Sequence, residues 1–273
     1  MLSRQYAKLC DRRDFDDPAL LDAIRELVPE RDPLAHIERK VWEFGIVMLF
    51  LADVGVLNGR VRALSVGAGN ERILFWLANR VGEIVAADTY GEGEFSGAEA
   101  EASMLTDPRA HAPFPYREER LTVARMDARE LRFPDASFDV VLTISAIEHF
   151  GTRREIAAAA AEIGRVLKPG GYAVIVTDCF AALSPVDTLP IWFLARLLTG
   201  GRRSRLATLR RRSALAQVFT AAELRSAIVE PSGLRMLQPL ETGVSVETYD
   251  KERLLIRRGR SAFTSACMVL SKP

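Results

Sequence analysis

Residues 62–88 read RALSVGAGNERILFWLANRVGEIVAAD, and this stretch decides the fold. The apolar run at 63–66 ends at a glycine turn, as short buried strands do. Apolar residues then recur at helical spacing over 73–78. A second apolar run, 83–87, ends on Asp88. The order of strand, glycine turn, helix and strand predicts a βαβ unit whose turn binds a ligand.

The glycine turn and the carboxylate indicate a ligand that carries a ribose. Gly67 and Gly69 allow the backbone to turn tightly and to approach a ligand closely. Asp88 follows the turn by about twenty residues, where a carboxylate accepts hydrogen bonds from both ribose hydroxyls. The third glycine of G-x-G-x-x-G is missing, and Glu71 stands where a pyrophosphate would lie, so a positively charged ligand suits this position better. An ordinary glycine turn in an α/β protein is the alternative.

Length and composition limit the class of protein. The chain has 273 residues, enough for one sizeable α/β domain with an appended element. Its net charge of +1 argues against general nucleic-acid binding. Three distant cysteines without metal spacing predict neither a disulfide framework nor a zinc site. Charged residues interrupt the N-terminus, and the most apolar stretch, 46–52, is too short to span a bilayer, so we expect a cytoplasmic protein.

The remaining chain continues the alternation of helices and strands. We expect residues 1–16 to form a loosely attached arm. Helices are expected from Asp17-Pro18, from Asp32-Pro33 to about Val54, over 98–105, over 156–167, and from a capping box at Thr220 and Glu223. Strands are expected over 121–126, 138–145 and 172–177, and twice within 234–271. His36, Glu38 and Arg39 are expected to be solvated.

Two further segments resemble the class I S-adenosylmethionine-dependent methyltransferases, and the resemblance covers residues 60–180. Residues 123–150, VARMDARELRFPDASFDVVLTISAIEHF, are similar to that family's segment from the third to the fourth strand. Residues 167–176, LKPGGYAVIV, are similar to its link into the fifth strand. The SVGAGNE turn, the D-x-Y that begins at Asp88, the APFPYREERL loop and the ending SAIEHFG resemble a bacterial subgroup associated with polysaccharide or secondary-metabolite pathways.

The resemblance implies an architecture. It is a Rossmann-like, doubly wound, mostly parallel seven-stranded sheet with helices on both faces, plus N-terminal helices and a lid-like insertion. The expected divisions are an N-terminal helical cap (1–58), a cofactor-binding core (59–178), a basic insertion or lid (179–218) and a C-terminal helix and strands that complete the sheet (219–273).

The resemblance also implies a cofactor, S-adenosylmethionine, with S-adenosylhomocysteine as product. Gly67 and Gly69 would flank its amino-acid end, and Asp88 would hold the ribose hydroxyls. Asp127 would receive the adenine amine beside the backbone of Ala128. Ser145 would face the methionine and the methyl group. The candidate cofactor-binding residues are Gly67, Ala68, Gly69, Glu71, Asp88, Thr89, Asp127, Ala128 and Ser145. Asp127 as a turn cap and Ser145 as a packed strand-end residue are the alternatives.

His149 is the candidate catalytic base, because it directly follows the fourth strand at the carboxyl edge where such sheets bind ligands. Imidazole can take a proton from a hydroxyl near neutral pH. Glu148 could orient His149 or act in its place. A helix cap or a structural lining of the cofactor site is the alternative for His149. No residue cluster suggests a catalytic metal.

The predicted function is O-methylation of a hydroxyl on a sugar or secondary metabolite by in-line displacement, with a small-molecule or glycan acceptor. N- or C-methylation, an inactive binding protein with this fold and a nicotinamide-dependent dehydrogenase are the alternatives. The arginine-rich part of 179–218 is a solvated face, a clamp for an acidic substrate or a contact with anionic lipid; membrane contact through 189–212 is not expected. Tyr90, Tyr116 and Trp192 face the substrate or anchor loops. The sequence predicts no oligomeric state.

Overall fold

The structure is a computed structural model that describes residues 2–92, 96–97, 99–184, 217–244 and 253–273. The strands of these residues are β1 (Lys8–Leu9), β2 (Arg62–Val66), β3 (Glu83–Asp88), β4 (Leu121–Arg125), β5 (Phe138–Ile144), β6 (Leu167–Ala182), β7 (Arg235–Met236), β8 (Ile256–Arg258) and β9 (Ser261–Ser271). The α-helices are α1 (Pro18–Leu27), α2 (Arg39–Asp53), α3 (Arg72–Ala78), α4 (Arg153–Val166), α8 (Ala221–Leu224) and α9 (Glu230–Ser232). The π-helical turn η7 (Arg225–Val229) joins α8 to α9. Short 3₁₀ helices are η1 (Arg12–Asp16), η2 (Ala102–Leu105), η3 (Pro108–His111), η4 (Glu118–Arg120) and η5 (Ile147–His149).

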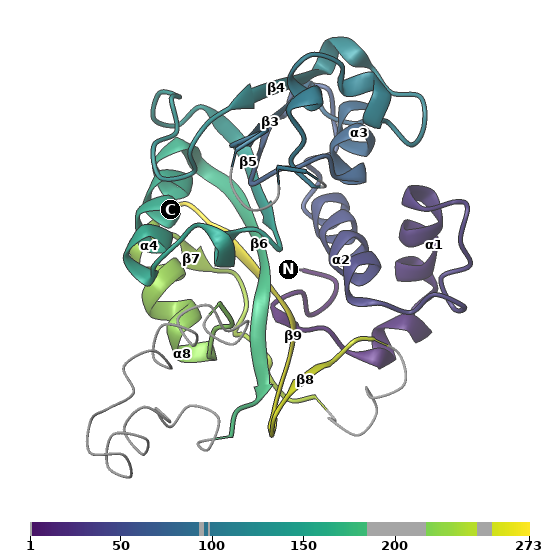
Figure 1. Cartoon of the computed structure of the whole chain (residues 1–273), viewed down its shortest axis with the longest axis vertical. Coiled ribbons are helices and arrows are strands. Elements are labelled where there is room, and N and C mark those ends of the chain that lie inside the picture. The colour runs from purple at the N-terminus through teal and green to yellow at the C-terminus, as the bar shows by residue number, and fades with distance from the viewer. Residues whose placement is uncertain (1, 93–95, 98, 185–216, 245–252) are drawn as a thin grey trace, which may run out of the picture.

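The strands form one sheet, which confirms the Rossmann-like α/β fold (Figure 1). Seven strands lie in the order β1-β9-β6-β5-β2-β3-β4, and the short strands β7 and β8 also pair with β9. The strands β2 to β6 run parallel, while β9 runs antiparallel to its neighbours. From β2 the chain continues to β3 on one side and later to β5 on the other, so the strand order switches between β2 and β5. Ligands of open α/β sheets bind at the carboxyl ends of the strands beside such a switch point.

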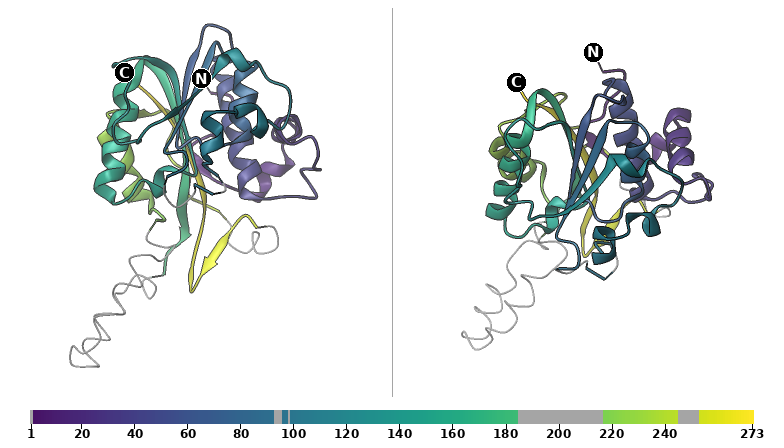
Figure 2. Two further views of the ribbon diagram at one scale, coloured as in Figure 1. Left: turned by 45° about the horizontal axis from the view of Figure 1, so that its top comes forward. Right: turned by 90° about the horizontal axis from the view of Figure 1, so that it is seen from above.

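Helices cover both faces of the sheet, which is why its central strands are apolar on both sides. Helices α4 and α8 lie on one face, and α1, α2 and α3 lie on the other (Figure 2). Each face has its own apolar cluster. In β5, Val140 packs toward one cluster and Val141 toward the other, as the alternation of side chains along a strand requires. The nearly continuous apolar run at 138–145 therefore reflects burial on both faces.

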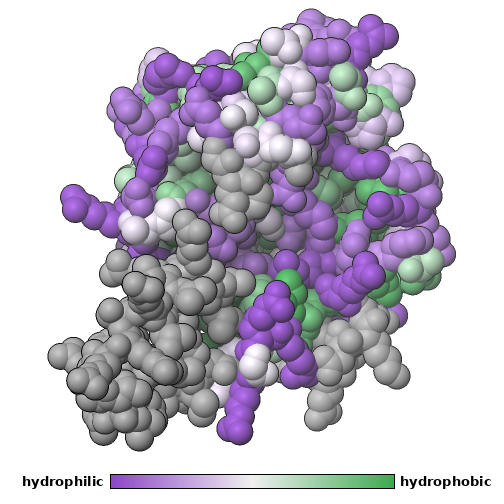
Figure 3. All heavy atoms as spheres, in the orientation of Figure 1, coloured by the Kyte–Doolittle hydropathy of each residue, from purple (hydrophilic) through white to green (hydrophobic). Residues whose placement is uncertain are grey.

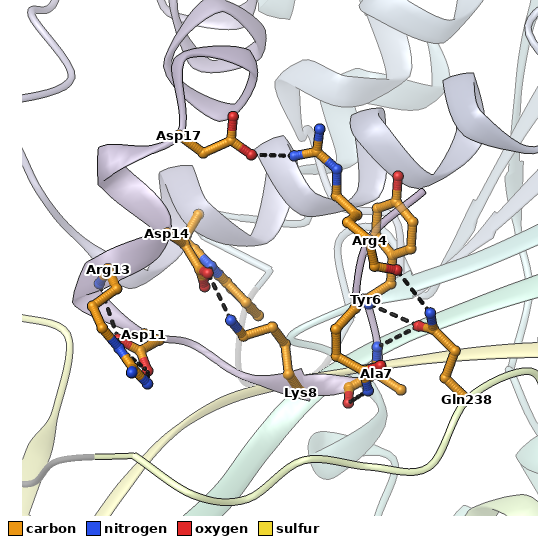
Figure 4. A network of polar contacts seen from close by, with 11 residues as sticks. Arg4, Tyr6, Ala7, Lys8, Asp11, Arg13, Asp14, Asp17 and Gln238 are labelled. Carbon is orange, nitrogen blue, oxygen red and sulfur yellow. Dashed lines mark hydrogen bonds and ion pairs between the residues drawn. The ribbon is translucent and has the colours of Figure 1, made fainter. Parts of the chain in front are cut away.

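The expectation of a loose N-terminal arm is wrong. Lys8 and Leu9 form β1 and pair with β9, so this segment belongs to the sheet. The side-chain oxygen of Gln238 accepts hydrogen bonds from the backbone N–H groups of Tyr6 (2.8 Å) and Ala7 (3.3 Å) (Figure 4). The ion pairs Arg4–Asp17, Lys8–Asp14 and Arg13–Asp11 hold the same segment to itself and to the start of α1. The contacts with β9 and Gln238 join residues more than 200 positions apart, so local sequence does not signal them.

Helix α1 begins where predicted, but α2 does not. Asp17 caps α1 by accepting a hydrogen bond from the N–H of Ala19 at 2.9 Å. Asp32 instead forms a turn, in which its carboxylate accepts from the N–H of Leu34 at 3.1 Å. The chain then becomes extended at Glu38 (φ −150°), and α2 begins only at Arg39. The Asp-Pro pair is common at turns as well as at helix starts, and here it forms a turn.

Other boundaries differ by a few residues. Helix α4 begins three residues before the predicted 156, because Thr152 and Glu155 form a capping box. The capping box predicted at Thr220 and Glu223 is confirmed. Of the predicted helix 98–105, the structure has the short η2, and β6 runs well beyond both ends of 172–177. Of 179–218, residues 185–216, which contain Trp192 and the arginine cluster, lie outside the described residues.

The surface of the described residues is mainly polar. Figure 3 shows a largely hydrophilic face with scattered apolar side chains. Among the large hydrophobic side chains of the described ranges, only Leu34 and Leu183 are exposed. In that part of the chain, every helix is too short or too polar to cross a lipid bilayer.

Candidate functional site

The glycine turn after β2 has a backbone that only glycine fits. Gly67 and Gly69 have φ angles of 65° and 50°. A Cβ at Gly67 would lie 2.5 Å from the Cβ of Ala146, and one at Gly69 would lie 2.4 Å from the backbone oxygen of Glu99. The turn is thus packed directly against the segment that follows β5 and against the loop that follows β3.

Hydrogen bonds fix the turn from the neighbouring strand. The N–H of Gly69 donates to Oδ2 of Asp88 at 2.8 Å, while Oδ1 of Asp88 accepts from the N–H of Thr89 at 2.6 Å. The buried hydroxyl of Tyr90 donates to the carbonyl of Gly69 at 2.8 Å, so Tyr90 is a loop anchor. Asp88, the candidate ribose ligand, is therefore held in place by the turn that precedes it.

A cavity of about 350 Å³ opens at the carboxyl ends of the parallel strands, and we call it the cofactor cavity. The structure brings most of the sequence-predicted residues together there. Its lining includes Gly67, Gly69, Glu71, Asp88, Thr89, Asp127, Ala128, Ser145 and His149. Ala68 is buried within the turn and does not line the cavity.

Asp127 and Ser145 both line the cofactor cavity, and each makes local hydrogen bonds. The carboxylate of Asp127 accepts hydrogen bonds from the N–H and the guanidinium of Arg129, and these bonds lower the pKa of Asp127. Asp127 thus caps its own turn while lining the cavity. Ser145 has φ 49°, which is unusual for a residue with a Cβ, and its N–H donates to the carbonyl of Val176 at 2.8 Å. Strained backbone of this kind is concentrated at functional sites.

Glu71 already has a cationic partner from the chain. Oε1 of Glu71 lies 2.5 Å from Nζ of Lys40, the second residue of α2. The same Nζ is 3.6 Å from Oε2 of Glu43, one turn further along α2. Burial raises the pKa of Glu71, and the positive charge of Lys40 opposes that rise. The preference of this position for a positive charge, expected from the sequence, is met here by Lys40.

A second cavity, of about 730 Å³, adjoins the first, and we call it the acceptor cavity. Its lining has only two apolar residues, Leu255 and Ile256. The polar and charged members are Glu38, Arg39, Lys40, Glu43, Glu99, Ser145, Glu148, His149, Asp178 and Arg253. Lys40, Glu99, Ser145 and His149 line both cavities, so the two spaces meet at these side chains.

His149 and Glu148 lie in η5, directly after β5, but in different surroundings. His149 is exposed and lines both cavities, whereas Glu148 is buried and lines only the acceptor cavity. The hydroxyl of Thr177 donates to Oε2 of Glu148 at 2.8 Å. Burial, helped by the negative charge of Asp178, raises the pKa of Glu148 to about 8. Glu148 is therefore largely protonated at neutral pH and unsuited to accept a proton there.

The raised pKa of Glu148 predicts a pH-dependent effect on stability. Between the ordinary pKa of 4.5 and about 8, the folded chain binds more protons than the unfolded chain, so Glu148 lowers the free energy of unfolding as pH rises through this window. Glu148→Gln should therefore melt at least about 3 °C above the wild type near pH 9 and close to it near pH 4. Differential scanning calorimetry across this range measures both differences.

Glu155→Gln is the matched control for this prediction. Glu155 accepts hydrogen bonds from Thr152 and pairs with Arg129, and these contacts lower its pKa. Replacement of Glu155 should therefore lower the melting temperature at high pH, whereas replacement of Glu148 should raise it. A Glu148→Gln difference that is independent of pH would contradict the prediction.

Arg39 is not solvated as expected. Its guanidinium donates to Oδ1 of Asp178 and lies 5.8 Å from the centre of the Phe263 ring. Only about a fifth of either side chain, Arg39 or Asp178, is exposed. Burial raises the pKa of Asp178, although the charges of Arg39 and His149 act in the opposite direction.

Sequence reasoning missed several residues of this site, chiefly Lys40, Glu43 and Asp178. Asp178 follows an apolar run at the end of a parallel strand, and that position was a usable signal. For α2 the sequence predicts a helix that packs on the sheet and whose polar residues help to close the ligand pocket, but no local pattern singles out Lys40 and Glu43. Their arrival at the site depends on where α2 docks.

Comparison with known proteins agrees with this geometry. Residues 64–175 match a family model described as a methyltransferase domain. Over these residues the chain has a methyltransferase domain, and its cofactor is S-adenosylmethionine. The matched residues begin in β2 and end in β6, so they include the glycine turn, Asp88, Asp127 and His149.

Several solved structures share the fold of this methyltransferase. A proposed methyltransferase from Bacillus halodurans C-125 aligns with a TM-score of 0.52 at 16% identity, over 82% of this chain and 97% of that one. A proposed sarcosine dimethylglycine methyltransferase from Galdieria sulphuraria aligns with a TM-score of 0.53 at 16% identity, over 92% and 98%. Geranyl diphosphate C-methyltransferase from Streptomyces coelicolor A3(2) aligns with a TM-score of 0.53 at 12% identity, over 100% and 90%. At these identities the likeness concerns the fold.

The cofactor cavity of the methyltransferase fits S-adenosylmethionine. Gly67 and Gly69 line this cavity, and the turn that they form has no room for a Cβ at either position. Asp88 offers carboxylate oxygens at the end of β3. The cation Lys40 lies beside Glu71, so groups of both signs are present for the charged amino-acid end of the cofactor. Residue by residue, these roles remain predictions.

Proposed function

We propose that this methyltransferase transfers a methyl group to a hydroxyl of a sugar or secondary metabolite. The observation that carries the proposal is the position of His149, which lines both the cofactor cavity and the acceptor cavity. A base at this boundary is within the space where an acceptor hydroxyl meets the cofactor. Among the described residues, His149 is the one histidine that lines either cavity.

The residues that line the acceptor cavity favour an acceptor with many hydroxyl groups. Ligand pockets for apolar molecules are lined mainly by hydrophobic and aromatic side chains, and this one is lined mainly by charged ones. An apolar acceptor would desolvate these groups without replacing their hydrogen bonds, which is costly. Hydroxyl groups both donate and accept, so a sugar-like acceptor satisfies carboxylates and cations alike.

The bound cofactor supplies an electrophilic methyl group on a sulfonium. Asp88 and the glycine turn would hold the cofactor at the ends of β2 and β3, and Ser145 lines both cavities. His149 takes the hydroxyl proton as the acceptor oxygen attacks in line. Positioning supplies much of the acceleration in such a displacement, and the base adds to it because an alcohol is a weak nucleophile while protonated.

An amine acceptor is the second candidate. The acceptor cavity is lined by five carboxyl groups, those of Glu38, Glu43, Glu99, Glu148 and Asp178. Its permanent cations are fewer, namely Arg39, Lys40 and Arg253. Because Glu148 is largely protonated at neutral pH, four of these carboxyl groups face three cations, and this small excess of negative charge favours a basic acceptor, for which a base is needed only to release the free amine.

Transfer of a labelled methyl group from S-adenosylmethionine to matched acceptors tests the proposal. Sugars and hydroxylated metabolites should be labelled on oxygen, as mass spectrometry and NMR of the product would show. Labelling on nitrogen would replace O-methylation with the second candidate. Calorimetric titration distinguishes an inactive binding protein, which would bind the cofactor and label nothing.

The proposal extends to the domain divisions and to membership of the bacterial subgroup associated with polysaccharide or secondary-metabolite pathways. We propose that residues 59–178 bind the cofactor and that 1–58 and 179–218 shape the acceptor cavity. The contribution of Arg39, Lys40 and Glu43 to that cavity supports the first of these assignments. A chimera with 179–218 exchanged should change acceptor preference and keep cofactor affinity.

A further inference from the structure

The ends of β5 and β6 place His149 and Asp178 in the same cavity. The two strands run parallel in register, with Ile144 paired to Val176. Beyond the paired residues, the Thr177 hydroxyl donates to Glu148 at 2.8 Å, and this contact is buried. The residues that follow each partner, Asp178 and His149, both line the acceptor cavity. The strand register therefore brings a carboxylate to the surroundings of the candidate base.

Asp178 is a fixed group. Arg39 of α2 donates to Oδ1 of Asp178, and its guanidinium packs over the ring of Phe263 on β9. In the backbone, Asp178 is paired with Ser265 of β9, and its carbonyl accepts from the N–H of Phe219 at 3.0 Å. An anion held in this way can orient a neighbouring imidazole and stabilise its protonated form.

Other carboxyl groups near His149 are less suited to this task. Glu148 is its sequence neighbour, but burial raises the pKa of Glu148 to about 8, so at neutral pH it carries little charge. Glu43 is 1% exposed, accepts from the Ser265 hydroxyl and lies beside Lys40. Asp178, by contrast, lines the acceptor cavity together with His149 and is held there by Arg39, and the positive charge of His149 acts to lower the pKa of Asp178.

We propose that Asp178, held by Arg39, is a positioning residue for His149 in the acceptor cavity. When His149 takes the hydroxyl proton, the imidazolium gains a charge that the carboxylate of Asp178 offsets. The acceptor oxygen keeps the electron pair of its broken O–H bond and uses it to bond the methyl carbon, while sulfur keeps the pair of the broken S–C bond. This role rests on the proposed base function of His149, but the electrostatic coupling can be measured without any acceptor.

Histidine NMR titration of the full chain is the direct test, because the chain has only three histidines, His36, His111 and His149. A His149 variant assigns the resonance. In Asp178→Asn, the acid dissociation constant of His149 should rise about tenfold, which corresponds to a lower pKa. Loss of the anion destabilises the imidazolium, and Arg39, no longer neutralised, acts in the same direction. His36 and His111 serve as internal controls and should titrate as in the wild type.

The comparison variants are chosen from the charged residues that line the acceptor cavity together with His149. These residues come from α2 (Glu38, Arg39, Lys40, Glu43), from the loop after β3 (Glu99), from η5 (Glu148), from β6 (Asp178) and from the segment before β8 (Arg253). Glu148→Gln should change the acid dissociation constant of His149 less than twofold, because Glu148 is already largely protonated below pH 7. Asp178→Glu keeps the charge and should restore most of the wild-type value. If Asp178→Asn is poorly folded, Asp178→Ser carries the same expectation.

An unchanged His149 titration in Asp178→Asn, or an equal change in Glu148→Gln, would overturn the proposal. In a methyl-transfer assay, the acid limb of the kcat profile of Asp178→Asn should move to lower pH together with the NMR value, with cofactor affinity kept. Full activity of a His149 variant would instead refute the proposed base function and leave the NMR coupling intact. The two failures are thus distinguishable.

Discussion

His149→Ala is expected to lower kcat for methyl transfer to a hydroxyl by about 100-fold or more, with cofactor affinity changed less than twofold. General-base catalysis by a positioned side chain contributes about 10²- to 10⁴-fold, and this variant removes it. His149 lies at the boundary of the cofactor cavity rather than within the turn that holds the cofactor, so binding should survive. Single-turnover transfer of a labelled methyl group measures the first effect, and calorimetric titration with S-adenosylhomocysteine measures the second.

His36→Ala is the matched control for this experiment. His36 is exposed, and Nδ1 of its ring lies 3.4 Å from the backbone carbonyl oxygen of Asp32. It lines neither of the two cavities described above, so its replacement should leave kcat unchanged. Equal activities of His149→Ala and wild type would remove the base from the mechanism. A loss of cofactor affinity that matches the loss of kcat would make His149 a lining residue instead.

Asp88→Ala is expected to weaken S-adenosylmethionine binding by about 100-fold. Two charge-assisted hydrogen bonds to ribose hydroxyls contribute about 3 kcal/mol together, which corresponds to a factor of about 100 in Kd. The variant also removes the acceptor of the Gly69 N–H, so the glycine turn loses the bond that fixes it. Asp88→Asn keeps the shape and one acceptor oxygen, and its loss should be intermediate. Calorimetric titration with the cofactor product gives the three dissociation constants.

Glu83→Ala is the control on the same strand. Glu83 begins β3, at the end of the sheet opposite the cavities, and pairs with Arg62 at 2.6 Å. Its loss should leave cofactor affinity within twofold of the wild type. If Asp88→Ala binds as tightly as Glu83→Ala while both remain folded, the ribose assignment fails.

The cofactor half of the site was predictable because its determinants are local in sequence. The strand, the glycine turn, α3 and Asp88 are consecutive, and each has a local cause in apolar periodicity or backbone freedom. Structure adds reasons that the sequence does not contain, such as the close approach of Glu99 to Gly69. The described residues form nine strands where seven were expected, because β1 lies in the segment expected to be a loose arm and residues 234–271 contain three strands instead of two.

The acceptor half was not predictable, because distant segments build it. Arg39 and Asp178 are 139 residues apart, and neither position has a local pattern that indicates the other. Lys40 was hidden in the same way, because it lies inside the predicted second helix and reaches the site only through the docking of α2 on the sheet.

The pairing of β1 with β9 has a consequence for synthesis on the ribosome. Lys8 pairs with Cys267, and β9 itself lies between β1 and β6. Strand β1 is therefore synthesised long before its partner β9. Contacts of such large sequence separation form slowly, and an unpaired strand edge invites aggregation until they form. For this protein the vulnerable interval lasts at least until β9 has left the exit tunnel.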